Sequence, residues 1–305
     1  MDRTRRDLLR WTSLSLAAAW PSAHLLGQAP APQQAPQPPP QTSFADVRRS
    51  VGLFNGQGGT IGTYVGQGAV VVVDTQFPDT ARICLDGLKT KSGGRAAQLV
   101  IDTHFHGDHT GGNGTFKAAG AKTIVAHAKV PELMTLRPRP DRPPPTPPDA
   151  TFPDSWRQDL GDEVVSARFY GPAHTGGDIV VHFEKANVVH MGDLVFNRLH
   201  PFIDRQGGGS VPGWITLLEQ ATKAHGTDTI FIFGHAGETF PVTGGRADLQ
   251  YQRDYFTALL EFTRKAKQGG QTRETFIKTS APLPGFADHG PLIELVTGAA
   301  WDELS

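Results

Sequence analysis

The stretch Thr-His-Phe-His-Gly-Asp-His, residues 103 to 109, places four potential metal ligands within six residues, directly after the apolar run at residues 98 to 101. The apolar run predicts a buried strand, and the polar stretch predicts a loop at its end. The ligands are His104, His106, Asp108 and His109. Imidazole and carboxylate groups suit zinc and other borderline divalent metals. Because the first two histidines can face one ion while the aspartate and the third histidine reach another, the loop is expected to bind two ions.

Three later segments have the same form, a β-branched or aromatic run that is broken by glycine beside a His or an Asp. Residues 165 to 170 precede His174, residues 187 to 191 precede Asp193, and residues 229 to 233 precede His235. Loops at one end of several strands can converge on one site, which is where open α/β folds tend to bind ligands. These three residues are therefore candidates to complete the site.

These seven residues, in this order, resemble the metallo-β-lactamase superfamily, whose signature His-x-His-x-Asp-His is met in full at residues 104 to 109. The resemblance covers about residues 48 to 240. It implies an α/β fold of four layers, the αββα sandwich, with two mixed sheets face to face and helices outside. It also implies two zinc ions, one on His104, His106 and His174 and the other on Asp108, His109 and His235, with Asp193 and a hydroxide between them. Iron and manganese are further candidates for the same ligands.

The resemblance implies a hydrolase that cleaves a carbonyl-type bond of a small molecule, a β-lactam or other amide, a lactone or a thioester. Asp108 is expected to be catalytic by orienting the attacking water. The β-lactamases carry a cysteine at the second zinc, or a serine beside it, where this chain has Asp193, so the wider hydrolase group is favoured. Three alternatives stay open: a metallo-β-lactamase proper, an iron-dependent enzyme resembling persulfide dioxygenases, and a non-catalytic periplasmic accessory protein that binds metal.

The remaining polar candidates have weaker sequence support. Asp74 ends an apolar run and is expected either to support the histidine loop by hydrogen bonds or to cap a helix. His200 follows Asp193 closely enough to overhang the site and touch substrate. His190 is expected to be structural or to support a ligand. The histidines without a spacing partner are expected at the surface or at helix caps; they are His127, His182, His225 and His289.

The N-terminal region has the features of an export signal. Residues 4 to 10 contain Arg5-Arg6 and resemble a twin-arginine signal, followed by an apolar stretch from residue 11 to 26. The sequence therefore predicts a signal peptide at residues 1–29, a Pro/Gln-rich linker at 30–45 and a hydrolase domain at 46–305 with a proline-rich loop at 138–150. The resemblance implies recognition by the twin-arginine export machinery and a location in the bacterial periplasm.

Composition is consistent with a soluble enzyme. The chain has 305 residues, 38% of them hydrophobic, and a formal net charge of -1, which disfavours a nucleic-acid partner. No later apolar run is long enough to cross a bilayer. With Cys84 as the single cysteine, an intramolecular disulfide is excluded, and this residue is expected to be a small buried hydrophobe.

Hydrophobic patterns predict the main elements. Strands are expected at 51–54, 60–65, 70–74 and 123–126, and helices at 78–91, 129–136 and 246–267. A further short helix is expected to open at Gly111-Gly112-Asn113. Another helix carries its apolar residues on one face and should pack on the sheet; these are Trp214, Leu217, Leu218 and Ala221.

Overall fold

The computed structural model describes residues 40–137 and 144–304. The chain divides into two units, residues 1–39 and 40–305, and the description below concerns the second unit. The predicted signal peptide and most of the predicted linker lie outside the described residues, as does the part of the proline-rich loop at 138–143. The expectations for those segments stay predictions.

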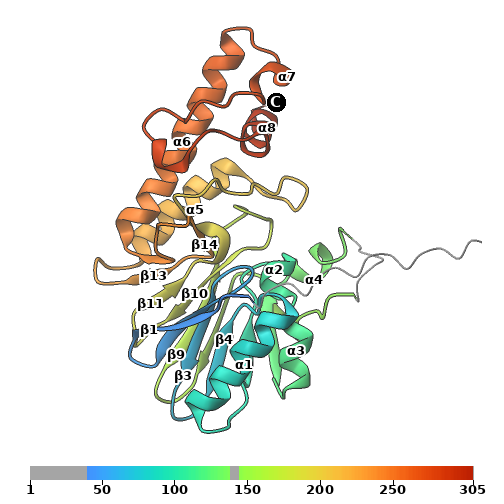
Figure 1. The fold of residues 1–305 in the computed structure, drawn as a ribbon, viewed down its shortest axis with the longest axis vertical. Helices are drawn as coiled ribbons and strands as arrows, with labels where there is room; N and C mark the ends of the chain where they lie inside the picture. The colour runs from blue at the N-terminus through green and yellow to red at the C-terminus, as the bar shows by residue number, and fades with distance from the viewer. Residues whose placement is uncertain (1–39, 138–143, 305) are drawn as a thin grey trace, which may run out of the picture. The chain divides into compact units, whose positions relative to one another are not determined.

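The first sheet has seven strands in the order of the chain (Figure 1). They are β1 (Ser43–Arg48), β2 (Val51–Asn55), β3 (Ile61–Val65), β4 (Val70–Val73), β5 (Leu99–Ile101), β6 (Thr123–His127) and β7 (Ala150–Phe152). The strands from β1 to β4 pair antiparallel, and those from β4 to β7 pair parallel. The switch to parallel pairing at β4 brings the carboxyl ends of β4, β5 and β6 to one edge of the sheet.

The second sheet has six strands in the order β15-β13-β11-β10-β9-β8. They are β8 (Ser155–Asp159), β9 (Val164–Phe169), β10 (Ile179–Phe183), β11 (Val188–His190), β13 (Ile230–Ile232) and β15 (Thr243–Gly244). Two short strands, β12 (Phe196–Asn197) and β14 (His235–Ala236), form a separate parallel pair. In the second sheet β11 and β13 are parallel neighbours, so their carboxyl ends also meet at one edge.

Strand β4 shows why the sheets lie face to face. All four of its valines are buried. Successive side chains of a strand point to opposite faces. Val71 and Val73 pack in the cluster between the sheets with Val181 and Ile232. Val70 and Val72 pack on the other face, where the cluster contains residues of helix α1 such as Leu88. A run that is apolar on both faces therefore belongs to a sheet covered on both sides.

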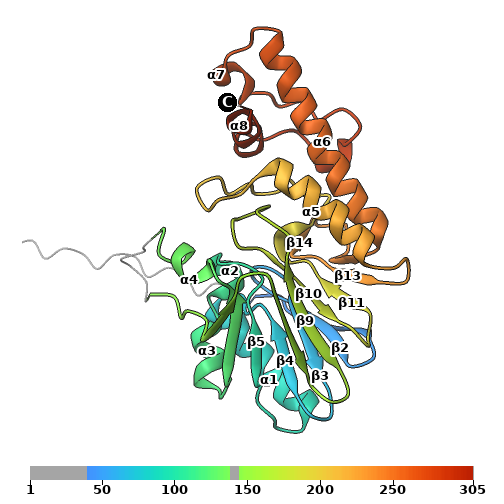
Figure 2. The ribbon, with the colours of Figure 1, turned by 180° about the vertical axis from the view of Figure 1, so that it is seen from behind.

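Helices form the two outer layers (Figures 1 and 2). Helices α1 (Pro78–Ser92) and α3 (Asn113–Ala118) cover the first sheet. Helices α5 (Val211–Ala224) and α6 (Arg246–Gln268) pack with the outer face of the second sheet. The short helices are α2 (Gly107–Thr110), α4 (Val130–Leu133), α7 (Arg273–Phe276), η1 (Gly192–Leu194) and η2 (Ala287–His289), and α8 (Glu294–Glu303) ends the described chain. The fold is the αββα sandwich that the sequence predicts.

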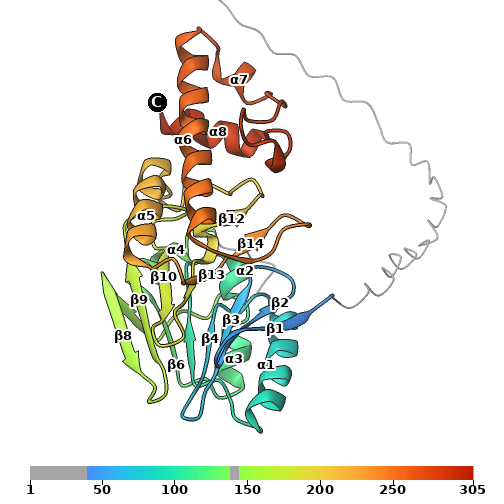
Figure 3. The ribbon, with the colours of Figure 1, turned by 90° about the vertical axis from the view of Figure 1, so that its left-hand side faces the viewer.

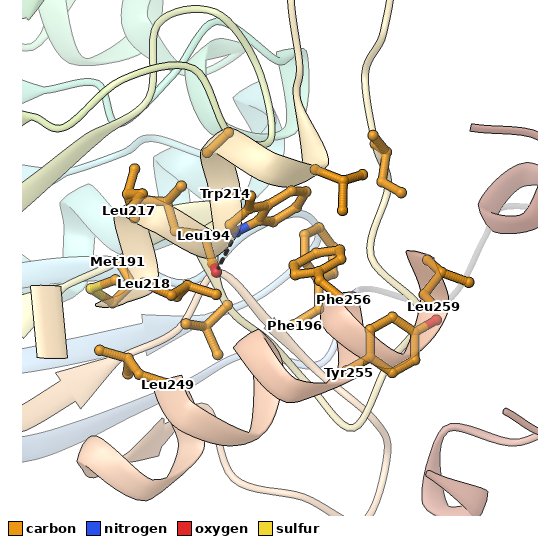
Figure 4. Close-up of a cluster of buried hydrophobic side chains, with 14 of the residues drawn as sticks. Met191, Leu194, Phe196, Trp214, Leu217, Leu218, Leu249, Tyr255, Phe256 and Leu259 are labelled. Carbon is orange, nitrogen blue, oxygen red and sulfur yellow. Dashed lines mark hydrogen bonds between the residues drawn. The ribbon is translucent and has the colours of Figure 1, made fainter. Parts of the chain in front are cut away.

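The apolar face predicted around Trp214 is confirmed. Figure 4 shows the Trp214 indole between the residues of α5 and Phe256 of α6, whose ring centroid lies 4.5 Å away. The Trp214 Nε1–H donates a hydrogen bond of 2.9 Å to the backbone oxygen of Leu194. A buried indole satisfied in this way joins α5 to the segment that directly follows Asp193. Figure 3 shows α6 running on past this core toward α7 and α8.

Several expectations need correction in detail. Strand β1 begins at Ser43, before the predicted end of the linker at residue 45. Helix α4 covers only Val130–Leu133 of the predicted 129–136. His127 and His289 are buried, at 3% and 8% exposure, rather than at the surface. His225 does occupy the C-cap of α5. The free Cys84 is fully buried, as expected.

Among the described residues, no helix is both long and apolar enough to cross a membrane.

Candidate metal centre

The candidate ligands lie at one edge of the two sheets because of the strand directions. The loop with His104 follows β5, Asp193 follows β11 and His235 follows β13, so all three leave carboxyl ends of parallel strands. His174 precedes β10, which runs antiparallel to β11, and therefore reaches the same edge. The sandwich thus brings together residues that are up to 131 positions apart, from 104 to 235.

The first cluster contains His104, His106, His174 and Asp193, whose ligand atoms all lie within 4.8 Å of one another. The Nε2 atom of His174 is 2.9 Å from Nδ1 of His106 and 3.5 Å from Oδ2 of Asp193. The Nε2 atom of His104 is 3.9 Å from the same carboxylate oxygen. Three imidazoles and one carboxylate oxygen therefore face a common point.

The second cluster contains Asp108, His109, Asp193 and His235 within the same limit of 4.8 Å. Oδ1 of Asp193 is 3.0 Å from Nε2 of His109 and 3.3 Å from Nε2 of His235. Oδ2 of Asp108 is 3.2 Å from Nε2 of His235 and 3.5 Å from Nε2 of His109. Asp193 is thus common to both clusters, and each of its oxygens faces a different one.

Three buried atoms at the centre of the clusters show that they suit cations. Nε2 of His104, Nε2 of His109 and Oδ1 of Asp193 have no hydrogen-bond partner of acceptable geometry in the described structure. A buried polar atom without a partner is costly, and a cation coordinated by it removes that cost. The donor set of imidazole nitrogens and carboxylate oxygens is one that zinc prefers.

The opposite nitrogen of four of the histidines is held by a specific partner. Nδ1 of His104 is 3.0 Å from Thr103 Oγ1, Nε2 of His106 is 2.8 Å from Asp204 Oδ2, Nδ1 of His109 is 2.7 Å from Asp74 Oδ2, and Nδ1 of His174 is 2.6 Å from the Phe202 carbonyl oxygen. Partners of this kind fix the tautomer and the ring orientation of a metal-binding histidine. The nitrogens that face the clusters are therefore free to act as ligands.

Asp74 supports the histidine loop, as the first of its two sequence readings predicts. Its carboxylate is fully buried and accepts hydrogen bonds from the Thr103 backbone N–H at 2.7 Å and the Thr103 hydroxyl at 2.9 Å, besides its contact with His109. The helix-cap reading is wrong, because the N-cap of α1 is Phe77.

Sequence reasoning missed Asp204. Its carboxylate is 1% exposed, contacts His106, and accepts hydrogen bonds from Arg137 and from the backbone N–H of Gly207. The residue lies at the start of a glycine-rich segment and follows no predicted strand, so it lacks the pattern that marked the other aspartates. The only sequence signal was its place shortly after Asp193.

His200 does not join the seven clustered residues. Its Nδ1 is 2.8 Å from the Tyr255 hydroxyl, and its Nε2 is 2.8 Å from the carbonyl oxygen of Pro291. His190 is structural, because its Nε2 contacts the Thr60 carbonyl oxygen at 3.0 Å while its Nδ1 accepts from the Gly192 N–H at 3.1 Å. Those two bonds fix a neutral ring immediately before the Asp193 turn.

Two glycines allow the backbone to approach the ligands closely. A Cβ added at Gly59 would lie 2.1 Å from Cε1 of His109, and one added at Gly234 would lie 2.1 Å from Oδ1 of Asp193. The Gly234 carbonyl oxygen also accepts a hydrogen bond of 2.9 Å from the Thr60 N–H. The β2–β3 loop and the end of β13 therefore close over the clusters from opposite sheets.

The two clusters differ in charge. Burial lowers the pKa of His104 and lowers that of His174 to about 3, so both rings are neutral. Burial also acts against charging His235, but the carboxylates of Asp193 and Asp108 outweigh it and raise its pKa to about 9. For Asp108, burial favours the neutral acid, yet His109 and His235 lower its pKa to about 2. Without metal, the second cluster therefore binds protons in place of a cation.

The family model of the metallo-beta-lactamase superfamily matches residues 56–237, more than half of the chain. The chain belongs to this superfamily. Members of the metallo-beta-lactamase superfamily are metal-dependent hydrolases, and the matched range contains all seven clustered residues.

One curated relative is a hydroxyacylglutathione hydrolase from Methylococcus capsulatus, 34% identical over 136 residues. The match covers 43% of this chain and 44% of the relative, so it spans less than half of the relative's length. Among solved structures, a metallo-beta-lactamase from Pontibacter korlensis has a TM-score of 0.61 at 16% identity and covers 71% of this chain and 99% of its own. A sec-alkylsulfatase from Pseudomonas sp. has a TM-score of 0.65 at 16% identity, with 86% and 50% covered. At these identities the structural likeness shows the superfamily fold alone.

Zinc binding to the metal-free protein at pH 7.5 should release protons from His235, whose pKa is raised to about 9, and from His109, whose pKa is also raised, because both rings must lose a proton to bind a metal. The proton on His235 stabilises the metal-free fold. This stabilisation is complete below pH about 6.5, the pKa of a histidine in the unfolded chain, and it is lost as the pH rises through 9. The release should therefore decrease as the pH rises through 9, because His235 no longer contributes to it. Calorimetry in buffers of different ionisation enthalpy measures it. A His127→Gln control should behave like the wild type, and a binding heat independent of buffer at pH 7.5 would contradict the expectation.

Proposed function

We propose that this protein is a dinuclear zinc hydrolase that cleaves a carbonyl-type bond of a small molecule. The observation that carries the proposal is the position of Asp193, whose two carboxylate oxygens face two separate clusters of histidines. A carboxylate shared in this way suits two cations held close together, as in two-metal hydrolytic sites. The ligands proposed for one ion are His104, His106 and His174, and those for the other are Asp108, His109 and His235, with Asp193 between them.

Two zinc ions bound there would supply Lewis acidity toward a carbonyl oxygen and a water of lowered pKa. The protein's own groups hold and orient these reactants. Asp108 and Asp193 carry two negative charges, whereas two divalent cations carry four positive ones, so the loaded site keeps an excess of positive charge. That excess favours substrates whose carbonyl develops negative charge during the reaction or which carry a carboxylate.

Asp108 is the residue proposed to act on the attacking water. It is 30% exposed, whereas the shared carboxylate, Asp193, is 5% exposed, so Asp108 is the one that solvent can reach. Its contacts to His109 and His235 run through Oδ2. This leaves Oδ1 to orient a water molecule and to accept its proton. Because its pKa is lowered, Asp108 is ionised at neutral pH and can accept a hydrogen bond from that water.

A thioester or another activated ester is the favoured substrate class. The curated relative is a hydrolase of hydroxyacylglutathione, which is a thioester, and it shares 34% identity over the matched part. Position 193 also supports a hydrolase outside the β-lactamase group. The β-lactamases carry a cysteine at the second zinc, or a serine beside it, where this chain has an aspartate. Lactones have a polarised acyl carbon like that of a thioester and are therefore a second candidate substrate. Cleavage of a β-lactam is the reaction against which both are compared.

Metal analysis and substrate testing on one preparation examine the proposal. We expect about two zinc ions per chain, measured by mass spectrometry, and turnover of a thioester or a lactone at a higher kcat/KM than a chromogenic cephalosporin. Removal of metal with a chelator should abolish turnover, and added zinc should restore it. About one iron per chain without hydrolysis of any of the three substrates would contradict the proposal and favour the oxygen-dependent alternative.

Replacing Asp108 by Asn separates its proposed action on water from its contribution to metal binding. The amide cannot accept a proton, so kcat should fall by about 10²-fold or more, while the zinc content at saturating metal falls much less. Parallel kinetics and metal analysis measure both effects. Asp228→Asn, at an exposed carboxylate paired with Arg48, is the control that should retain activity. A variant with full metal and full activity would rule out the role of Asp108.

A further inference from the structure

The exposed side chain of Arg137 reaches a candidate metal ligand through one buried carboxylate. Asp204 Oδ2 is 2.8 Å from Nε2 of His106, and Asp204 Oδ1 accepts hydrogen bonds from Nη2 of Arg137 and, at 2.8 Å, from the Gly207 N–H. The Asp204 carboxylate is 1% exposed, whereas the Arg137 side chain is 41% exposed. A solvent-accessible cation therefore contacts the group that orients His106.

Among the described residues, no arginine or lysine forms a hydrogen bond with the corresponding carboxylate of the second cluster, Asp74. Asp74 is fully buried, and its carboxylate contacts His109 Nδ1 and accepts hydrogen bonds from the N–H and the hydroxyl of Thr103. These donors from Thr103 are neutral. The two carboxylate–histidine pairs therefore differ, since Asp204 interacts with a guanidinium and Asp74 with neutral donors of its own sheet edge.

The backbone of Asp204 is already fixed without Arg137. Its N–H donates to the His174 carbonyl oxygen at 3.1 Å, and its carbonyl oxygen accepts from the Gly209 N–H at 2.7 Å. The rotation of the carboxylate is set by the Gly207 N–H and by Arg137, which both donate to Oδ1, and it determines whether Oδ2 can accept a hydrogen bond from a proton on Nε2 of His106. With that proton on Nε2, the Nδ1 lone pair points into the first cluster, 2.9 Å from Nε2 of His174.

We propose that Arg137 is a positioning residue for the metal ion of the first cluster, acting through Asp204 on the tautomer and orientation of His106. The inference rests on the proposed metal-dependent function. It deepens that function because it assigns a positioning arginine to the ion of the first cluster, whereas the described partners of Asp74 at the second cluster include no arginine. Partners behind a metal-binding histidine change metal affinity by about 10- to 100-fold. Loss of Arg137 should thus weaken one of the two ions and leave the other in place.

Arg205 provides a matched control. It lies next to Asp204 in the glycine-rich segment, and its side chain is 41% exposed, like that of Arg137. It forms hydrogen bonds with the Gly209 carbonyl oxygen and with Glu303 of α8. Neither partner is the Asp204 carboxylate. If Arg137 acted only by holding this segment in place, the two arginines would have similar effects on metal binding.

The test is a zinc titration of the purified wild type, Arg137→Gln, Arg137→Lys and Arg205→Gln in competition with a chromogenic chelator. In Arg137→Gln we expect one of the two zinc equivalents to bind about 10- to 100-fold more weakly, with partial recovery in Arg137→Lys and recovery on addition of guanidinium ion. Arg205→Gln should bind both equivalents like the wild type. Circular dichroism of each variant shows that it is folded.

Wild-type affinity for both ions in Arg137→Gln would overturn the inference, as would equal weakening in Arg205→Gln or a loss that guanidinium does not restore. A wild type that binds two zinc ions supports the proposed function whatever the variants do. A wild type that binds none contradicts the proposed function and the inference together, so the failure of each is distinguishable.

Discussion

The shared carboxylate of Asp193 is the constraint on which the rest of the site depends. It is 5% exposed, and its two oxygens lie within 3.0–3.9 Å of four different histidines. Such a group is costly to bury unless positive charge meets it from both sides. Protons on His109 and His235 supply part of that charge in the metal-free protein, and two cations would supply all of it.

The sandwich positions this group because the loops with His104, Asp193 and His235 follow short strands whose residues are almost all buried. Strand β4 is typical, with valines packed alternately between the sheets and against α1. A shift of such a strand by one residue would move every side chain to the opposite face and would displace the loop at its end. The pairing with parallel neighbours therefore fixes where each loop begins. Gly59 and Gly234 then let the main chain of both sheets approach His109 and Asp193. Packing therefore sets the distances within the clusters before any metal is considered.

The sequence allowed most of this to be predicted, for identifiable reasons. Strands β4, β5 and β13 are continuous apolar runs, β11 is apolar up to His190, and each strand is followed within two residues by a glycine or an aspartate that could be read directly. Strand β8 was not predicted, because it lies at a sheet edge and is mostly exposed, which leaves no apolar pattern. Asp204 was missed because no strand precedes it. His200 lies near Asp193 in sequence, but its side chain contacts Tyr255 and Pro291, and spacing alone carries no information on that direction.

Anomalous diffraction from crystals of the zinc-loaded protein tests the central claim most directly. The account predicts two zinc peaks about 3.5–4 Å apart, with one oxygen of Asp193 about 2.0–2.2 Å from each. The histidines of the first cluster should coordinate one peak, and Asp108 with the histidines of the second should coordinate the other. A single peak, or two peaks of which either lacks Asp193 as a ligand, would contradict the account.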